Sequence, residues 1–403
     1  MNIEQKFLLD YVGHCLNNTS NTSIKEFPWD LQYDEIKWGQ VKILIGKYGL
    51  YNFLWLDNLD DDRYVELKND KVLRQHMFME MDRIIKQTHR WGGIKDAFEK
   101  AKIEGIALKG IITKDLYPID ILRTMHDIDI LYKEQQHSKM EKALNDIGFV
   151  CKKKALKHDH FLDELGIHIE MHREMVDVDT NYHKYYSDVW KKAKKLIGYQ
   201  HVFTLSPEDM YIYTLIHMKE HLIRGEATIK MVIDVYVMRN KERLDYDYIS
   251  NELERIALQE FEKNVVDLSE KWFKDGCNIT SHDRIYELSE FLLGNQTYGV
   301  GNIYSAYYAY NVGKNKYSFY LKSAFPSLRR MQTLFVWLKP YPILLPIAWI
   351  IRIVRAVSRR REIVGAEVRK AEGINNAAYE QGKKFSKMLS KYGVSSHEKS
   401  GQV

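Results

Sequence analysis

The spacing of apolar residues predicts helices along most of the chain and strands in one short part of it. Helical spacing covers 4–16, 41–45 and 74–102, and the last of these would be one long helix that Gly92-Gly93 could interrupt. The pattern is again helical from Ser206 and Pro207, a typical helix start, to about residue 293. Between these parts, short strands alternate with helices. The pattern therefore predicts an α+β fold with a small mixed sheet embedded in mostly helical N- and C-terminal regions.

The same pattern predicts four parts. Residues 1–100 form a helical N-terminal region, and 101–204 form the core that contains the sheet. Residues 205–312 form a second helical domain. Residues 313–403 form a basic, aromatic helical tail that frays at its end.

Two stretches of the core alternate polar and aliphatic residues, which is the pattern of a strand with one buried face. In the first, Asp127 and Asp129 share a face; in the second, Glu170 lies between His168 and His172 on one face. If the strands are neighbours, three carboxylates meet at one point. Such a cluster repels itself unless a hard divalent cation lies within it, and this geometry suits two-metal phosphoryl or nucleotidyl chemistry. An Asp-x-Asp pair by itself is more often the solvated edge of a strand. The presence of Lys109-Gly110 before this pair and of Glu170 after it favours the metal site instead.

The amino-acid composition disfavours several classes of protein and of metal site. With 403 residues, 45% of them hydrophobic, the chain can bury a large core. Its three cysteines lie far apart, which disfavours both a disulfide framework and a thiolate metal site and fits a reducing cytosol. The first residues lack a basic segment followed by an apolar run, so we expect no cleaved secretion signal and a cytoplasmic protein.

Charge is unevenly spread. Residues 313–361 contain eleven Lys or Arg and no Asp or Glu, which indicates an acidic partner for this segment. Residues 334–354 are strongly apolar, but the uncharged stretch 340–351 is shorter than the ~20 residues of a spanning helix. Two interpretations remain open for 330–361: a helix on an anionic membrane surface, which would make the protein peripheral on the inner face of the membrane, or a helix packed on the protein's own helical domain. Nucleic acid is not favoured, because the basic residues form no long regular stripe.

Across residues 100–245 the sequence resembles the uncharacterised-type nucleotidyltransferases of the polymerase-beta-like superfamily. The resemblance lies in the order of several short motifs, namely Leu108-Lys109-Gly110, Tyr117-Pro118, Arg123, Asp127-Ile128-Asp129, Gly148-Phe149, Ile169-Glu170-Met171-His172, Leu205-Ser206-Pro207-Glu208-Asp209, His217, His221 and Ile233-Asp234.

This resemblance implies a Mg²⁺-dependent enzyme that transfers a nucleoside monophosphate from an NTP to an acceptor that the sequence does not identify. Asp127, Asp129 and Glu170 would be the catalytic carboxylates and would bind two Mg²⁺ ions, or Mn²⁺ in their place. Lys109 and Gly110 would form the turn that holds the phosphates. The superfamily favours Ser or Gly after this glycine, whereas Ile111 stands here.

Four further residues are candidates for substrate binding. Arg123 could neutralise charge on the phosphates or form a structural ion pair with one of the aspartates. Among the clustered histidines, His172 is the one expected to approach substrate. His217 and His221 have the i, i+4 spacing of a Zn²⁺ pair, but without an evident third ligand we expect them to line a cleft and contact the nucleotide or the acceptor.

Two alternatives come from other classes. The chain could be a catalytically idle member that uses the same fold as a binding or scaffold module, including one at a membrane. It could also be an antitoxin-like protein that modifies or sequesters another protein. The sequence indicates no oligomeric state.

Overall fold

The computed structural model describes residues 1–18, 27, 33, 35–55, 65–155, 157–274, 276–294, 303–312, 321, 324–359 and 376–394. Two compact units divide the chain. The first consists of Met1–Met175, Asp188–Ile216 and Thr228–Asn295, and the second of Val176–Ser187, His217–Ala227 and Gln296–Val403. Helix α9 (Pro207–Arg224) contributes to both units.

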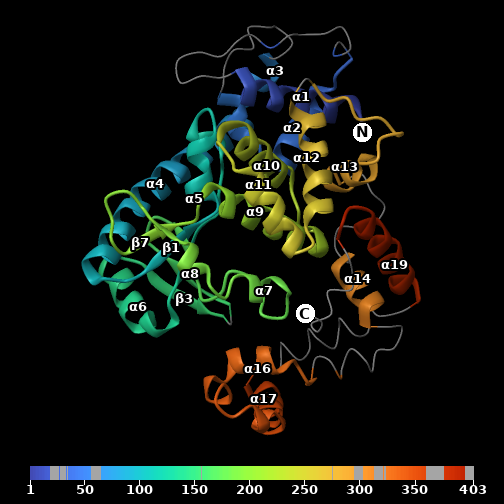
Figure 1. Ribbon diagram of the computed structural model, residues 1–403. Helices are drawn as coiled ribbons and strands as arrows, with labels where there is room; N and C mark the ends of the chain where they lie inside the picture. The colour runs from blue at the N-terminus through green and yellow to red at the C-terminus, as the bar shows by residue number, and fades with distance from the viewer. Residues whose placement is uncertain are drawn as a thin grey trace. The chain divides into compact units, whose positions relative to one another are not determined.

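The first unit contains a mixed seven-stranded sheet (Figure 1). Its strands, in chain order, are β1 (Gly105–Leu108), β2 (Asp127–Tyr132), β3 (Val150–Lys154), β4 (His158–Leu162), β5 (His168–His172), β6 (Lys194–Lys195) and β7 (Val202–Thr204). Their order in the sheet is β3-β4-β5-β2-β1-β7-β6. Strand β2 pairs with β5 in parallel and β1 with β7 in parallel, and the other pairs are antiparallel.

One face of the sheet is apolar and packs against α4 (Lys71–Ala101) and α6 (His137–Asp146). Trp91, Ile94 and Phe98 of α4 contribute to this core, together with Ile128 and Ile130 of β2. Because side chains alternate along a strand, Asp127 and Asp129 project from the opposite face. The alternation that predicted β2 from the sequence therefore separates a core face from a polar face.

Helices form the rest of the first unit. Its further helices are α1 (Ile3–Asn18), α2 (Trp38–Tyr48), α3 (Val65–Lys68), α5 (Gly110–Thr113), α8 (Val189–Lys192), α10 (Ile229–Lys241), α11 (Tyr246–Arg255), α12 (Gln259–Phe273) and α13 (Tyr286–Leu292). Gly49 ends α2 in a left-handed conformation, and α9 starts at Pro207, as predicted. Helix α4 runs through Gly92-Gly93 without interruption. The predicted α+β class is confirmed.

The second unit contains α7 (Tyr182–Tyr185), α14 (Ile303–Val312), α16 (Leu328–Leu334), α17 (Leu345–Arg359) and α19 (Asn376–Lys391). Helices α16 and α17 enclose a small core of their own, formed by Met331, Phe335, Leu338 and Ala348. Within the described part of the chain, every helix is too short or too polar to cross a membrane. Of the basic segment 313–361, residues 313–320, 322, 323, 360 and 361 lie outside the described residues, as do residues 395–403, where the tail was predicted to fray.

Candidate functional site

The parallel pairing of β2 and β5 brings the three predicted carboxylates together. In this ladder Asp127 lies opposite His168, and Asp129 lies opposite Glu170. One carboxylate oxygen from each of Asp127, Asp129 and Glu170 lies within 4.8 Å of the others. These are oxygen ligands of the kind that Mg²⁺ and Mn²⁺ prefer, so the residues present fit a hard divalent cation.

Asp129 is the most firmly held member of this carboxylate cluster. Its side chain is 7% exposed, and its Oδ1 lies 3.0 Å from Lys109 Nζ and 2.7 Å from His172 Nε2. Burial by itself would raise the pKa of Asp129, but the charge of Lys109 and the hydrogen bond from His172 together hold that pKa below its ordinary value. Asp129 is therefore ionised at neutral pH.

Asp127 has the opposite character. Burial and the negative charges of Asp129 and Glu170 raise the pKa of Asp127 to about 7. At neutral pH this carboxyl therefore exchanges readily between its protonated and ionised forms. A cation bound among the three carboxylates would favour the ionised form.

Histidines surround Glu170. Strand β4 pairs antiparallel with β5, so that His158 lies opposite His172 and His160 lies opposite Glu170. Burial opposes ionisation of Glu170, but its hydrogen bond from His172 lowers the pKa of Glu170 below its ordinary value. Burial and repulsion by His172 lower the pKa of His158 to about 4, which leaves His158 neutral at pH 7.

Strand β4 was not predicted, and His158 and His160 were expected to lie near the site without contacting substrate. The signal for this strand is weak, because the buried Asp159 is charged and interrupts the alternation of polar and apolar residues.

Lys109 and Gly110 lie at the end of β1, as predicted for a phosphate-binding turn. Lys109 has a φ of 51°, which is rare for a residue other than glycine and stores backbone strain. A Cβ on Gly110 would lie 3.2 Å from Met125 Sδ, so a larger residue would require the Met125 side chain to shift. The ammonium of Lys109 pairs with Asp129, and this charge raises the pKa of Lys109 although burial opposes the shift.

Arg123 pairs with a carboxylate outside the cluster. Its Nε donates to Asp234 Oδ1 over 2.6 Å and its Nη2 donates to Asp234 Oδ2 over 2.8 Å. Tyr117 donates to the same Asp234 Oδ1 over 2.6 Å. The structural ion pair weighed for Arg123 is thus formed with α10 rather than with Asp127 or Asp129. Its predicted contact with substrate phosphates stays a prediction.

Comparison with known proteins gives a family. Residues 32–274 match the family described as uncharacterised nucleotidyltransferase, which is more than half of the chain. The chain belongs to this nucleotidyltransferase family. In sequence, no curated protein matches it. Among solved structures, the antibiotic-resistance factor ANT(2'')-Ia is similar over 46% of this chain and 97% of its own, at 10% sequence identity and a TM-score of 0.33.

His217 and His221 of this nucleotidyltransferase lie on α9, one helical turn apart. Their ring centroids are 4.3 Å apart, and His221 Nδ1 lies 3.4 Å from Glu226 Oε2. Both belong to the second unit, whereas the carboxylate cluster belongs to the first. Their predicted role in binding nucleotide or acceptor stays a prediction.

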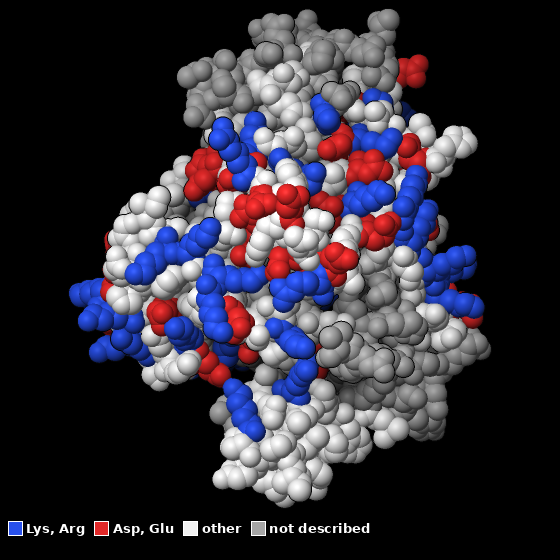
Figure 2. All heavy atoms as spheres, in the orientation of Figure 1, with Lys and Arg blue, Asp and Glu red and all other residues white. Residues whose placement is uncertain are grey.

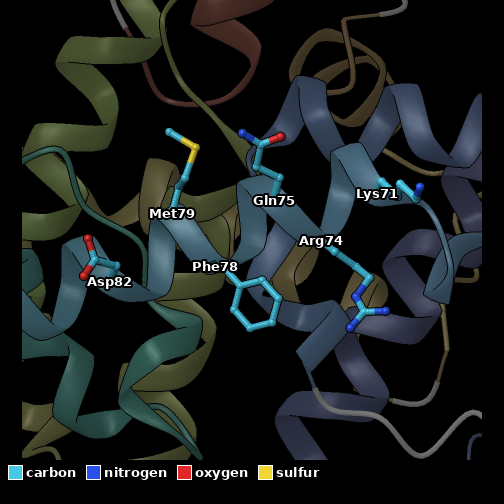
Figure 3. A pocket seen from close by; sticks show the side chains of 6 residues that line it. All are labelled: Lys71, Arg74, Gln75, Phe78, Met79 and Asp82. Carbon is cyan, nitrogen blue, oxygen red and sulfur yellow. The ribbon is translucent and has the colours of Figure 1, made fainter.

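An open hollow of about 540 Å³ lies along α4. Figure 3 shows the side chains that line it, which are Lys71, Arg74, Gln75, Phe78, Met79 and Asp82. Phe78 and Met79 are about half exposed, so the hollow has an apolar part between charged ends. None of the predicted site residues lines this hollow.

Proposed function

We propose that this nucleotidyltransferase transfers a nucleoside monophosphate from an NTP to an acceptor hydroxyl or phosphate, with Mg²⁺ held by Asp127, Asp129 and Glu170. The observation that carries the proposal is the convergence of these three carboxylates on one polar face of the sheet. Mg²⁺ or Mn²⁺ bound there would neutralise phosphate charge and activate the acceptor oxygen. Family membership favours a transferase over an idle scaffold.

The chain's own residues would divide the remaining tasks. The acceptor oxygen forms a bond to the α-phosphorus, the bond to pyrophosphate breaks, and Glu170 receives the proton that the acceptor loses. Lys109, which neutralises Asp129, would place its positive charge beside the triphosphate. His172 donates to Asp129 and so keeps that carboxylate ionised and oriented.

Labelled transfer tests the proposal. The full-length protein is incubated with each α-labelled NTP and Mg²⁺ or Mn²⁺, and both pyrophosphate release and label transfer to co-purified material are measured. We expect activity in the wild type and at least a ~100-fold loss in Asp127→Asn/Asp129→Asn, because the two charges that hold the cation are removed. Asp188→Asn removes an exposed carboxylate and should have wild-type activity. Equal nucleotide binding and transfer in the wild type and the double variant would exclude this function.

We also propose that α17 attaches the protein to an anionic membrane surface. Ile343, Ile347, Ile350 and Val354 follow helical spacing and are 50–86% exposed, so they form an apolar stripe on one face. Trp337 and Tyr341 nearby are also exposed. Figure 2 shows this part of the drawn face as mostly uncharged.

Charge makes an anionic lipid surface the fitting partner for the stripe. No acidic residue occurs in 313–361, and Arg329 and Arg355 are exposed. An apolar stripe with basic neighbours binds at the boundary between headgroups and acyl chains.

Vesicle pelleting tests the attachment. The protein should pellet with phosphatidylserine-containing vesicles at low salt, and less with phosphatidylcholine vesicles or in 0.5 M NaCl, because screening weakens the basic contribution. Ile347→Asn/Ile350→Asn should abolish pelleting. Ile43→Asn/Ile85→Asn alters two isoleucines that are each 61% exposed on α2 and α4, and should pellet normally. Pelleting that both double variants retain would contradict the attachment.

A further inference from the structure

Three imidazoles lie around one carboxylate on the polar face of the sheet. His158 and His160 come from β4, and Glu170 and His172 come from the neighbouring β5. The ring centroid of His158 is 4.6 Å from that of His160 and 4.8 Å from that of His172. Two adjacent strands thus place imidazole nitrogens, which can serve as metal ligands, directly beside the carboxylate cluster.

The distances at Glu170 resemble those between ligands of one metal ion. Its Oε2 lies 3.4 Å from His158 Nε2 and 3.4 Å from His172 Nε2. Ligand atoms about 2.0–2.2 Å from a shared ion lie roughly 3.0–3.5 Å from one another. One atom from each of His158, Glu170 and His172 also lies within 4.8 Å of the others. His160 Nδ1 faces the other oxygen, Oε1, at 3.3 Å.

Burial favours an ion at this position over a hydrated surface pair. The side chain of His172 is 5% exposed and that of Glu170 is 19% exposed. Among the described residues, the Nδ1 atoms of His158 and His172 are buried and have no hydrogen-bond partner. The Nε2 atoms of both rings face Glu170 instead, so an ion beside that carboxylate would bind both rings through Nε2.

We propose that His158, Glu170 and His172 form a second metal position that takes a first-row transition-metal dication such as Mn²⁺ or Co²⁺. Imidazole nitrogens suit these ions, whereas Mg²⁺ prefers oxygen ligands alone. Glu170 is shared with the carboxylate cluster, and ligation by His172 replaces its hydrogen bond to Asp129. This inference concerns metal identity and goes beyond the proposed transfer reaction, on which it does not depend.

Pulsed EPR of Mn²⁺ bound to the metal-free full-length protein tests the inference, because it detects ¹⁴N nuclei of directly bound imidazole. We expect ¹⁴N modulation in the wild type and none in His158→Ala/His172→Ala. His160→Ala, on the same strand face but beside the other oxygen, should retain it. Calorimetric titration should show Mn²⁺ affinity at least about tenfold weaker in His158→Ala, with Mg²⁺ affinity changed less than about twofold.

Bound Mn²⁺ without ¹⁴N modulation in the wild type would overturn the inference, as would His158→Ala with unchanged modulation and affinity. Circular dichroism checks that each variant folds, and His158→Gln replaces His158→Ala if the latter does not. Asp127→Asn/Asp129→Asn separates the two proposals. Nitrogen modulation that persists in this variant supports the histidine position by itself, and a wild type without transfer activity but with ¹⁴N modulation would refute only the proposed function.

Discussion

Asp127 and Asp129 lie two residues apart on one strand, yet their carboxyls have opposite properties. Lys109 and His172 contact Asp129 directly and lower its pKa. For Asp127, burial and the repulsion from Asp129 and Glu170 outweigh the attraction of Lys109 and His172. Position on the strand therefore determines the charge of each aspartate, although the two residues are chemically identical.

The raised pKa of Asp127 predicts how the stability of the metal-free protein depends on pH. The pKa rises from 3.8 to about 7 on folding, so the folded state binds more protons than the unfolded state between these values. This stabilising contribution is complete below pH 3.8 and is lost as the pH rises through about 7. Asp127→Asn cannot ionise, so above pH 7 it should be about 1–3 kcal/mol more stable than the wild type.

Denaturant unfolding in the presence of a chelator measures this difference. The stability advantage of Asp127→Asn should grow between pH 5 and pH 8. Saturating Mg²⁺ should reduce it, because only the wild type retains all three carboxylates to bind the ion. An advantage that is constant over this pH range would contradict the assigned cause.

Arg123 gives a second prediction at this scale. Its guanidinium binds both oxygens of Asp234, and the side chains of the pair are 15% and 8% exposed. Arg123→Ala leaves the buried Asp234 carboxylate without its cation and should cost about 3–5 kcal/mol in urea unfolding. Lys86→Ala removes an exposed i, i+4 pair with Asp82 and should cost less than about 0.5 kcal/mol. If Arg123→Ala weakened NTP binding without loss of stability, the phosphate role would be favoured instead.

At the residue scale, the sequence was sufficient to predict that the three carboxylates lie together. It was insufficient to predict which charged residues pair with one another. Alternation with buried aliphatic residues encodes the face on which Asp127, Asp129 and Glu170 lie. The partner of Arg123 is 111 residues away, and no local pattern encodes such a pairing. The same holds for Lys109, which was predicted to meet a phosphate and pairs with Asp129 in the structure.

Among the elements, helices pack most closely where a glycine faces a neighbouring backbone. A Cβ on Gly13 of α1 would lie 2.6 Å from the carbonyl oxygen of Phe273 on α12. That oxygen also accepts a hydrogen bond from Asn17 over 2.6 Å. The contact between α1 and α12 therefore depends on the absence of a side chain at residue 13.

Glycine-to-alanine substitutions should thus have opposite effects in two helices. Gly13→Ala forces α12 away and should destabilise the protein by about 1–3 kcal/mol. Gly92→Ala on α4 meets no atom within 4 Å and should stabilise it by about 0.5–1 kcal/mol, because alanine favours the helix. Thermal unfolding of both variants checks the signs. Equal shifts in one direction would contradict the packing described for α1 and α12.

Elements with a strong hydrophobic period were predicted well from the sequence, whereas short elements were not. Strands β2 and β5 and helices α1, α2 and α4 follow clear patterns, and α4 continues through Gly92-Gly93 without a break. Strand β4 was missed because one of its inward positions is the charged Asp159, so polar and apolar residues do not alternate along it. The two-residue β6 and three-residue β7 are too short to show a period.

At the scale of the whole molecule, we expect each ligand to stabilise the part of the chain that binds it. The match covers 32–274, which includes every strand of the sheet, whereas α17 lies beyond it. Binding of a metal ion or NTP should therefore stabilise the sheet, by about 2.7 kcal/mol at a ligand concentration 100 times Kd. The sequence alone predicted the fold class, but the strand order of the sheet depends on long-range pairings that it does not reveal.

Hydrogen exchange measured by mass spectrometry can locate this stabilisation. On addition of Mn²⁺ and NTP, amide protection should rise in β2, β4 and β5 and remain unchanged in α16 and α17. Anionic vesicles should give the reverse distribution. An equal rise in both regions with Mn²⁺ and NTP would contradict the assignment of the ligand site to the sheet.

The ladder between β2 and β5 also limits which changes in length the chain can accept. A shift of β5 by one residue would turn Glu170 to the core face and bring an aliphatic residue to the site. The turn at 163–167 lies outside the ladder, so insertions there leave the pairing intact, while a single-residue deletion inside 168–172 destroys it. Evolution and protein engineering can therefore remodel the hairpin turn between β4 and β5, provided that the strands themselves keep their number of residues.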